Sequence, residues 1–587
     1  MCGIFGHTQP GKNPTASRRA LNTLAHRGPD QWNDWQDKEV YVGHRRLSII
    51  DLSEHGRQPM SAQGVVITVN GEIYNYKTLK KELGNKYAYQ SDSDSEVLIY
   101  GYLEWGMDKL LEKLEGMYAF VLYDTRQRKL FLGRDRAGIK PLYYSHKGGQ
   151  IAWASELKAL TSFHTEAKLE VDSTAVYDYL TYRYIPTPKT LYKDVYKLPP
   201  AQYLELDLHT HKLQKKQYWT LGLVKINPTL DEAAAKVREL VDQAVQEQLM
   251  SDVPVGFFLS GGMDSSTVVG IAAQHSKQLN TYAIGFDIKE HDETHFAELV
   301  AKKFKTNHRR KVVSVGEVKK LFPKIKDWYD EPFADTSTFP VYIVSKLTKP
   351  SSTVVLTGDG GDEVFGGYNW YADFKKNAPG FIKENYPGSR LKRKLTRSHQ
   401  ATITNLEFAY YTKLMGGLTR EEKAGYRKQF GIADSYDDYW YFRKFYRPEL
   451  PLYTRLQYLD FHTYLHDDIL TKVDRASMAV ALECRVPLLS TPLIEYLFSL
   501  PENIRYHNGE LKGLMKYAFH DLLPDEILNR KKKGFSIPTG RWQPNLMERD
   551  TTVPEFILKK FFNNTTGRSK TAAPSQHKRL QHSRRNF

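Results

Sequence analysis

Alternation of apolar and polar residues dominates the first part of the chain. The stretch VVITVNGEIYN (65–75) is a β-branched run that ends in a turn. Two further runs, YAFVLYD (118–124) and KLFLGRD (129–135), flank the polar turn TRQR, which predicts a hairpin. Between these strands, residues 93–116 carry helical spacing after a Ser/Asp cluster typical of a helix start. The pattern predicts an α+β domain with antiparallel sheets.

The pattern changes from about residue 230 onward. A helical segment precedes the strand VPVGFFLS, the loop SGGMDSS and a second helix, and the strands TYAIGF (281–286) and STVVL (352–356) follow. Strands that alternate with helices indicate an α/β domain with a parallel sheet. Ligands of such sheets gather at the carboxyl ends of the strands, where SGGMDSS and TGDGGDE both fall. Residues 400–530 are mainly helical in pattern.

Composition narrows the class of protein. The chain has 587 residues, too many for one core, with 41% apolar and 26% charged residues, which is typical of globular proteins. No apolar run approaches the ~20 residues that cross a bilayer, and the N-terminus lacks the pattern of a secretory signal. Cys2 and Cys484 are too few for a disulfide framework. We therefore expect a cytoplasmic protein without membrane insertion.

The net charge of +16 raises the question of a polyanionic partner. Residues 567–587 contain several Lys and Arg and no acidic residue, and SRLKRKLTR (389–397) forms a second basic cluster. The chain shows no signature of a nucleic-acid-binding module. We interpret these charges as solvated surface and tail, and we expect no nucleic-acid partner.

The loop SGGMDSS (260–266) is the first candidate for chemistry. Its glycines allow a polyanion close to the backbone, and the following helix offers its N-terminal N–H groups. A glycine loop at such a junction is also often a simple tight turn. Its residues resemble the pyrophosphate-binding signature S-G-G-x-D-S of the ATP pyrophosphatases, which adenylate a substrate with ATP.

Within that class, residues 2–545 resemble the glutamine-dependent asparagine synthetases. The resemblance rests on many ordered motifs: MCGIFG, HRGPD (26–30), RRLSIIDL (45–52), NGEIYN (70–75), SDSE (93–96), GRDRAGIKPLYY (133–144), SGGMDSS, TGDGGDEVFGGY (357–368), KVDRASMA (472–479), ECRVPLL (483–489) and RKKKGFS (530–536). It implies a two-domain fold. Residues 2–185 would form an N-terminal-nucleophile (Ntn) glutaminase with an αββα architecture, 186–225 a connector, 226–545 an ATP-pyrophosphatase domain with a parallel sheet and helical additions, and 546–587 an atypical basic tail.

Position 2 suits amide hydrolysis. Removal of Met1 would give Cys2 both a thiol, with a pKa near ~8.5, and a free α-amine, with a pKa near ~7.7–8.0, to act as nucleophile and base. By resemblance, Asn70 and Gly71 form the oxyanion hole, Arg46 binds the glutamine carboxylate, and Glu72 and Asp94 bind its ammonium. The full set implied to bind glutamine is Arg46, Leu47, Ser48, Ile49, Ile50, Asn70, Gly71, Glu72 and Asp94. Taken singly, Asn70-Gly71 is also a hairpin dipeptide and Asp94 a helix cap.

The second set of residues would bind ATP. The resemblance implies that Asp264 and Asp362 hold Mg²⁺, that Lys532 stabilises the transferring phosphorus, and that Asp359 is a catalytic acid. The residues implied to bind ATP are Leu259, Ser260, Gly261, Gly262, Asp264, Ser265, Ser266, Ile284, Thr357 and Gly358. Without the resemblance, GDGGDE could be a solvated turn and KKK a surface run. Some relatives carry Glu at the position of Asp359. The histidines of the chain do not have the spacing of zinc ligands.

The resemblance implies one coupled reaction. Glutamine hydrolysis supplies ammonia, which passes between packed domains to a carboxylate that ATP has adenylated, with aspartate as the favoured acceptor. The stretch YDEPFADTSTFP (329–340) and Ser490, where relatives often have Asp, leave open another acceptor such as a nucleotide-sugar uronate. The atypical tail leaves open a noncatalytic binding protein. A homodimer also stays open.

Overall fold

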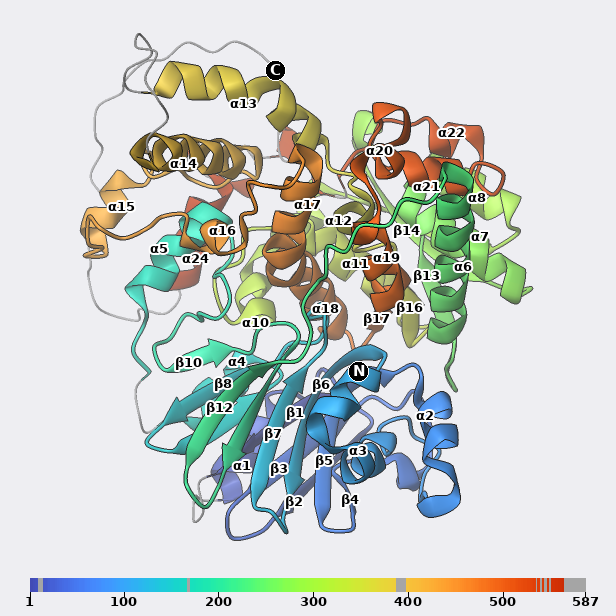
Figure 1. Ribbon diagram of the computed structural model, residues 1–587, viewed down its shortest axis with the longest axis vertical. Coiled ribbons are helices and arrows are strands. Elements are labelled where there is room, and N and C mark those ends of the chain that lie inside the picture. Colours follow the sequence, from blue (N-terminus) through green and yellow to red (C-terminus); the bar gives the residue numbers. More distant parts are fainter. Residues whose placement is uncertain are drawn as a thin grey trace.

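The structure is a computed structural model that describes residues 1–8, 14–165, 169–386, 397–534, 536–538, 541–542, 546–547 and 551–563. Two domains lie one above the other in Figure 1, with the N-terminal domain below. The predicted basic cluster up to residue 396 and the basic end at 567–587 lie outside the described residues.

Two antiparallel six-stranded sheets form the N-terminal domain. The first sheet has the order β10 (Val195–Lys197), β8 (Tyr143–Lys147), β9 (Gln150–Ala154), β1 (Gly3–His7), β3 (Tyr41–Arg46), β2 (Gln31–Gln36). The second has the order β12 (Lys212–Gln217), β11 (Gln202–Asp207), β7 (Lys129–Arg134), β6 (Gly116–Asp124), β5 (Val65–Ile73), β4 (Met60–Ala62). Helices α1 (Pro14–Asn22) and α4 (Leu157–Phe163) cover the first sheet, and α2 (Tyr76–Leu83) and α3 (Val97–Lys113) lie over the second.

Strand β6 shows why this layering forms. Ala119, Val121 and Tyr123 join the core between the two sheets, whereas the alternate residues Phe120 and Leu122 join the core under α3. Successive side chains of a strand point to opposite faces, so an apolar strand buried on both faces needs a layer on each side. The predicted αββα fold with antiparallel sheets is confirmed.

The predicted connector, 186–225, contributes to both sheets. Strand β10 pairs with β8 at the edge of the first sheet, and β11 and β12 extend the second sheet beyond β7. Its prolines suggest a linker, yet the alternation in QYLELDL (202–208) supplies apolar side chains to the core between the sheets. The chain leaves the domain only after residue 217 and enters α6 (Leu230–Gln248), which a Thr229–Glu232 capping box begins.

A five-stranded parallel sheet organises the C-terminal domain. Its order is β15 (Asn307–Val313), β14 (Asn280–Phe286), β13 (Val255–Phe258), β16 (Val354–Leu356), β17 (Glu483–Arg485). The chain moves outward from β13 through α7 (Met263–His275) and α8 (Thr294–Lys303), and returns to the other side of β13 at β16. This reversal opens a crevice at the carboxyl ends of β13 and β16, the usual ligand position in such sheets.

Further helices surround this sheet. Helices α11 (Thr338–Thr348) and α18 (Leu470–Met478) pack together, and α18 also contacts β17. The remaining described α-helices are α5 (Ser173–Tyr182), α9 (Val315–Leu321), α10 (Ile325–Tyr329), α12 (Gly361–Phe365), α13 (Asn369–Asn385), α14 (Arg397–Leu414), α15 (Ala424–Gln429), α16 (Trp440–Phe445), α17 (Leu452–His462), α19 (Thr491–Ser499), α20 (Glu502–Arg505), α21 (Gly513–Ala518), α22 (Asp525–Leu528) and α24 (Val553–Asn563).

Part of the predicted tail packs against the body of the protein. Helix α24 lies beside α5, where the Tyr179 hydroxyl donates to the carbonyl of Pro554 at 3.0 Å. Tyr426 donates to Glu555 Oε1 at 3.0 Å, and Phe556 is buried. The apolar face of the helix therefore holds residues 553–563 in place, and residues 564–587 lie outside the described part.

A buried charge network joins the two domains. Arg27 is fully buried and donates to both carboxylate oxygens of Asp474 on α18, at 2.8 and 3.0 Å. It also donates to Glu156 Oε1 at 2.8 Å and to the carbonyl of Cys2 at 3.0 Å. Bidentate pairing satisfies a buried guanidinium that would otherwise be costly. One arginine thus fixes the segment around Cys2 against the C-terminal domain.

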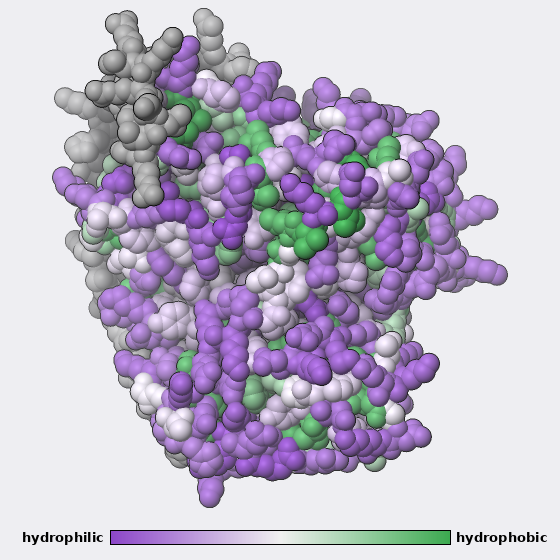
Figure 2. All heavy atoms as spheres, viewed as in Figure 1, coloured by the Kyte–Doolittle hydropathy of each residue, from purple (hydrophilic) through white to green (hydrophobic). Residues whose placement is uncertain are grey.

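The exterior carries the net charge. The face in Figure 2 is largely hydrophilic, with hydrophobic residues in smaller patches. Among the described residues, none of the helices has the length and apolar character needed to span a bilayer.

We expect Asp474→Ala to lower the free energy of unfolding by about 3–5 kcal/mol, because it leaves Arg27 buried without its main partner. Urea unfolding followed by fluorescence measures the change. Arg18→Ala, which removes an exposed pair with Asp34, is the matched control and should cost less than about 1 kcal/mol. Equal losses in the two variants would contradict the role assigned to the buried network.

Candidate functional site

Cys2 lies directly before β1, with its side chain in the interior near the junction of the two domains. Its backbone N–H donates to Asn70 Oδ1 on β5 at 3.0 Å. Asn70 is fully buried, and its amide nitrogen Nδ2 has no hydrogen-bond partner among the described residues. A buried donor that is left unpaired costs free energy and calls for a functional explanation. An amide N–H₂ held beside a thiol is suited to binding a developing oxyanion.

The next residues of β5 complete the surroundings of the thiol. A Cβ at Gly71 would lie 2.0 Å from the carbonyl of Met117 on β6, so only glycine fits here. Glu72 is buried, and its Oε2 has no hydrogen-bond partner within the described part of the chain. Asp94 is also buried and accepts from the N–H of Ile73 at 2.6 Å. The structure thus brings Glu72 close to the thiol, with Asp94 as a second buried acid beside Glu72.

Burial dominates the electrostatics around Cys2. It raises the pKa of the Cys2 thiol, and the N-terminal ammonium, the Leu47 backbone and Arg46 offset this only partly. Burial, together with the neighbouring Glu483, also raises the pKa of Glu72 well above its usual range. Burial raises the pKa of Asp94 as well. A cationic group that enters this site would favour the ionised carboxylates.

Arg46 ends β3 and is held by the loop that follows it. Its guanidinium donates to the carbonyl of Ser53 at 3.0 Å, to that of Ile50 at 3.2 Å and to that of Asp51. It also donates to Gln31 Oε1 at 2.8 Å. Arg46, which is predicted to bind a carboxylate, therefore also holds the loop beside the thiol through these hydrogen bonds.

The apolar residues of this loop face the other domain. Leu47, Ile49 and Ile50 pack in one cluster with Met1 and with three residues of the C-terminal domain: Val354, Met478 and Ala481. Ser48 is half-buried, and its N–H donates to Asp30 Oδ2 at 2.8 Å. The side chains of the predicted glutamine-binding residues Leu47, Ile49 and Ile50 thus contribute to the domain interface.

A cavity of about 730 Å³ lies at the reversal point of the parallel sheet. The loops after β13 and β16 form its floor and approach closely, since a Cβ at Gly358 would lie 2.6 Å from the backbone nitrogen of Ser265. Ser260 Oγ accepts from the N–H of Gly262 at 3.2 Å and lies 3.1 Å from Ser265 Oγ. These contacts fix the conformation of the loop before α7, and the N-terminus of this helix is a favourable position for a phosphate group.

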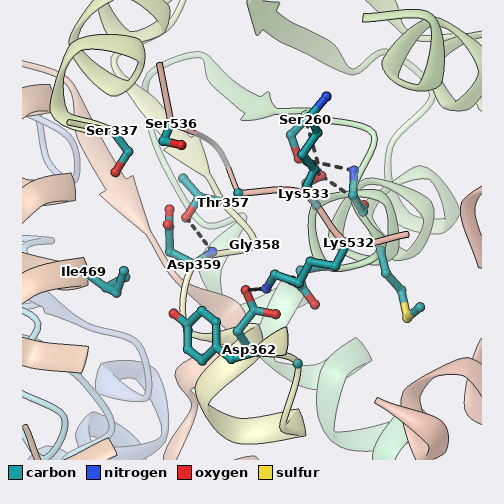
Figure 3. Close-up of a pocket in the computed structure, with 18 of the residues that line it drawn as sticks. Ser260, Ser337, Thr357, Gly358, Asp359, Asp362, Ile469, Lys532, Lys533 and Ser536 are labelled. Carbon is teal, nitrogen blue, oxygen red and sulfur yellow. Dashed lines mark hydrogen bonds and ion pairs between the residues drawn. The ribbon is translucent and has the colours of Figure 1, made fainter. Parts of the chain in front are cut away.

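Two acids and two lysines meet in this cavity. The ammonium of Lys512 lies between Asp264 and Asp362, at 2.5 Å from a carboxylate oxygen of each. Lys532 also pairs with Asp362, as Figure 3 shows. A cation therefore already bridges the two predicted metal ligands, and their hard oxygen donors fit Mg²⁺. Among the described residues, no group of three or more His, Cys, Asp or Glu side chains comes together in a way that could hold a metal ion.

Asp359 borders the opposite side of the cavity. In Figure 3 its carboxylate lies away from the Lys532–Asp362 pair, toward the part that Ser337 and Ile469 border. Burial raises the pKa of Asp359, and the nearby charge of Lys472 opposes the shift. Lys472 pairs with Asp335 at 3.2 Å in the same wall. The cavity thus has a lysine-rich end beside the glycine loop and a mixed-charge end beside Asp359.

Most of the predicted ATP-binding residues line this cavity: Leu259, Ser260, Gly262, Asp264, Ser265, Thr357 and Gly358. Gly261, Ser266 and Ile284 are not among the described residues of its wall, although Tyr282 and Ala283, on the strand of Ile284, are. The bridging Lys512 was not predicted from the sequence. Neither was Lys472 of the cavity wall, although it lies in the motif KVDRASMA, nor Arg485 of the motif ECRVPLL, which lies 3.6 Å from Glu72.

Comparison with protein families gives two matches that together span most of the chain. Residues 236–578 match the asparagine synthase family, and residues 1–219 match the glutamine amidotransferase domain. The first match runs through α24, and the second includes the strands β10 to β12.

Several curated proteins resemble the chain over most of its length. "Asparagine synthetase [glutamine-hydrolyzing] 1" of Bacillus subtilis is 34% identical over 93% of this chain and 88% of the relative. A putative glutamine-hydrolysing asparagine synthetase of Mycobacterium tuberculosis is 32% identical over 92% of this chain and 88% of the relative. "Putative asparagine synthetase [glutamine-hydrolyzing] 2" of Methanocaldococcus jannaschii is 35% identical over 81% of this chain and 98% of the relative.

Lys532 gives the cavity a pH dependence. Burial lowers the pKa of Lys532 to about 8, and the nearby Asp264 opposes this only in part. The ammonium is present below that pH and is lost above it, and bound phosphates favour the charged form. We expect the affinity for ATP to fall as the pH rises from 7 to 9.

Isothermal titration calorimetry at several pH values measures this change. Lys532→Arg is the control, because a guanidinium keeps its charge over this range and should give a flat profile. A flat profile for the unmodified protein would contradict the assignment of this lysine to phosphate binding.

Proposed function

The chain belongs to the asparagine synthase family and is an enzyme that catalyses a glutamine-dependent amidation, and on this premise we propose that it forms asparagine from aspartate through a β-aspartyl-AMP intermediate. ATP would be converted to AMP and pyrophosphate. Ammonia from glutamine would pass from the site at Cys2 to the cavity of the parallel sheet.

The first step would be amide hydrolysis at Cys2. Once Met1 is removed, the α-amine of Cys2 takes the thiol proton, and the thiolate attacks the side-chain amide carbon of glutamine. Asn70 Nδ2, buried and unpaired within the described chain, binds the oxyanion together with the Gly71 N–H. The protonated amine returns its proton to the leaving ammonia, and water then cleaves the thioester to glutamate. Arg46 binds the α-carboxylate, and Glu72 and Asp94 bind the α-ammonium.

The second step would be adenylation in the cavity. The β-carboxylate of aspartate attacks the α-phosphorus of ATP, and pyrophosphate leaves against the loop 260–266 and Lys532. Bound Mg²⁺ would supply charge neutralisation between the phosphates, with Asp264 and Asp362 as its ligands. Ammonia then attacks the acyl carbon, Asp359 accepts a proton, and AMP leaves with the former carboxylate oxygen.

The observation that carries the proposal is the contact between the two sites. Leu47 and Ile50, in the loop beside the thiol, pack in one cluster with Val354 at the start of β16, and β16 leads directly to Thr357 and Asp359 in the cavity. An apolar, buried junction of this kind favours neutral ammonia over ammonium. It therefore supports direct transfer between the sites.

Charges in the mixed end of the cavity favour aspartate as the acceptor. Lys472 and Arg183 can face its α-carboxylate, and Asp335 can face its α-ammonium, since all three border the cavity. A nucleotide-sugar uronate would present no ammonium group for Asp335.

Replacement of the nucleophile should separate the two half-reactions. We expect Cys2→Ala to abolish glutamine-dependent synthesis, by at least 10³-fold, because the amide bond then lacks its nucleophile. Ammonia-dependent synthesis should stay within about twofold of the unmodified enzyme, since the cavity is unchanged. Glutamate and asparagine release measure the two activities, and Cys484→Ala, which removes the other buried cysteine, is the control. Glutamine hydrolysis that survives in Cys2→Ala would refute the assignment of Cys2.

Pyrophosphate release identifies the acceptor. With ATP and glutamine present, we expect release with aspartate and none above background with a panel of nucleotide-sugar uronates. Asp335→Asn should raise the KM for aspartate about tenfold, because it removes the partner of the α-ammonium. Release with uronates alone would refute asparagine synthesis, and the absence of release with every acceptor tested would favour a noncatalytic relative.

A further inference from the structure

Strand β17 of the C-terminal sheet reaches the glutamine site of the other domain. Glu483 and Arg485, the first and last residues of this strand, are both fully buried. Glu483 Oε2 accepts from the N-terminal ammonium of Met1 at 2.7 Å, beside Cys2. Arg485 Nη2 lies 3.6 Å from Glu72 Oε1. Two residues far along the chain thus border the site that the first 100 residues form.

Three hydrogen bonds hold the Arg485 side chain in one orientation. Its Nε donates to Glu483 Oε1 at 2.7 Å, and its Nη1 donates to the carbonyls of Gln248 at 2.8 Å and Met250 at 2.6 Å. The remaining nitrogen, Nη2, has no hydrogen-bond partner among the described residues and faces Glu72. The fork of the guanidinium is therefore fixed on three sides and is open only toward Glu72.

Glu72 needs a positive neighbour. It shares a buried region with two other acids, Asp94 and Glu483, and both raise its pKa, as burial itself does. Arg485 opposes these effects. A protonated Glu72 would attract an ammonium group only weakly.

We propose that Arg485 is a positioning residue for glutamine binding: it holds the Glu72 carboxylate toward the α-ammonium of glutamine, so that the C-terminal domain completes the glutamine site. This inference rests on the proposed function of Cys2 and Glu72. Arg485 does not touch the substrate and acts through Glu72.

The position of Arg485 also links the two sites. Its backbone carbonyl accepts from the N–H of Thr357, in the cavity floor, at 2.9 Å. In the β16–β17 register Arg485 lies opposite Leu356, the residue before Thr357. One residue of the sheet therefore contacts the cavity floor through its backbone and the glutamine site through its side chain.

The test is a double-mutant cycle on the full-length enzyme, with glutaminase activity as the readout. We expect Arg485→Met to lower kcat/KM for glutamine at least tenfold, through a higher KM, with kcat within about threefold. In a Glu72→Gln background, where no carboxylate needs orienting, Arg485→Met should lower kcat/KM less than twofold. Ammonia-dependent synthesis should change less than twofold in Arg485→Met.

Two further variants separate this role from general loss of structure. Arg505→Met removes another buried arginine of the same domain, one that bonds Leu500, Gln457 and Thr454, and should leave the KM for glutamine unchanged. If Arg485→Met does not fold, Arg485→Lys is used in the same cycle, because an ammonium lacks the fork that spans Glu483 and Glu72. It should lower kcat/KM at least fivefold with Glu72 present and less than twofold without it.

The outcomes are distinct. An unchanged kcat/KM in a folded Arg485 variant, or an equal loss in both backgrounds, would overturn the inference while the proposed function stands. An unmodified enzyme that shows no Cys2-dependent glutamine hydrolysis would overturn both.

Discussion

The full burial of Arg27 is the constraint on which the junction of the two domains depends. The N–H groups of a buried guanidinium need hydrogen-bond acceptors, and those of Arg27 donate to Asp474, Glu156 and the carbonyl of Cys2. One side chain thereby fixes the segment around Cys2, the first sheet of the N-terminal domain and helix α18 relative to one another. Removing any partner would leave a buried charge, so the domain arrangement and the position of Cys2 are set together.

The same interface brings the two candidate sites together. It is apolar around Met1 and Leu47 and charged around Arg27, Glu483 and Arg485. The apolar part buries the boundary between the domains, and the charged part places Arg485 beside Glu72. Strand β16 packs at this boundary and continues into the loop that lines the cavity, so one sheet of the C-terminal domain contacts both candidate sites.

The cavity of the parallel sheet shows a related use of charge. Asp264 and Asp362 would repel each other, and Lys512 lies between them in the structure. The acidic pair and the lysines together match a bound phosphate chain with its cation, which carries both signs of charge. Asp359 lies apart from this cluster, so the lysine-rich end and the mixed-charge end of the cavity differ in their chemistry.

The sequence by itself determined the two fold classes, and most of the residues that it assigned to ATP binding line the cavity. Alternation in strands such as β6 and the strand–loop–helix order around SGGMDSS are local properties, and local spacing fixes which face a side chain occupies. The sequence did not reveal that residues 195–217 add strands to both sheets, because a short edge strand is defined by its partner and not by its own composition.

Only the tertiary structure decided how distant residues meet. From the sequence, Arg46 was predicted only to bind the substrate. The structure shows that it also donates hydrogen bonds to the carbonyls of the loop that follows it. Nothing in the spacing of Glu72 and Arg485 relates them, since more than four hundred residues separate them. They approach because buried charges must be paired, and the chain can pair them only once both domains have folded against each other.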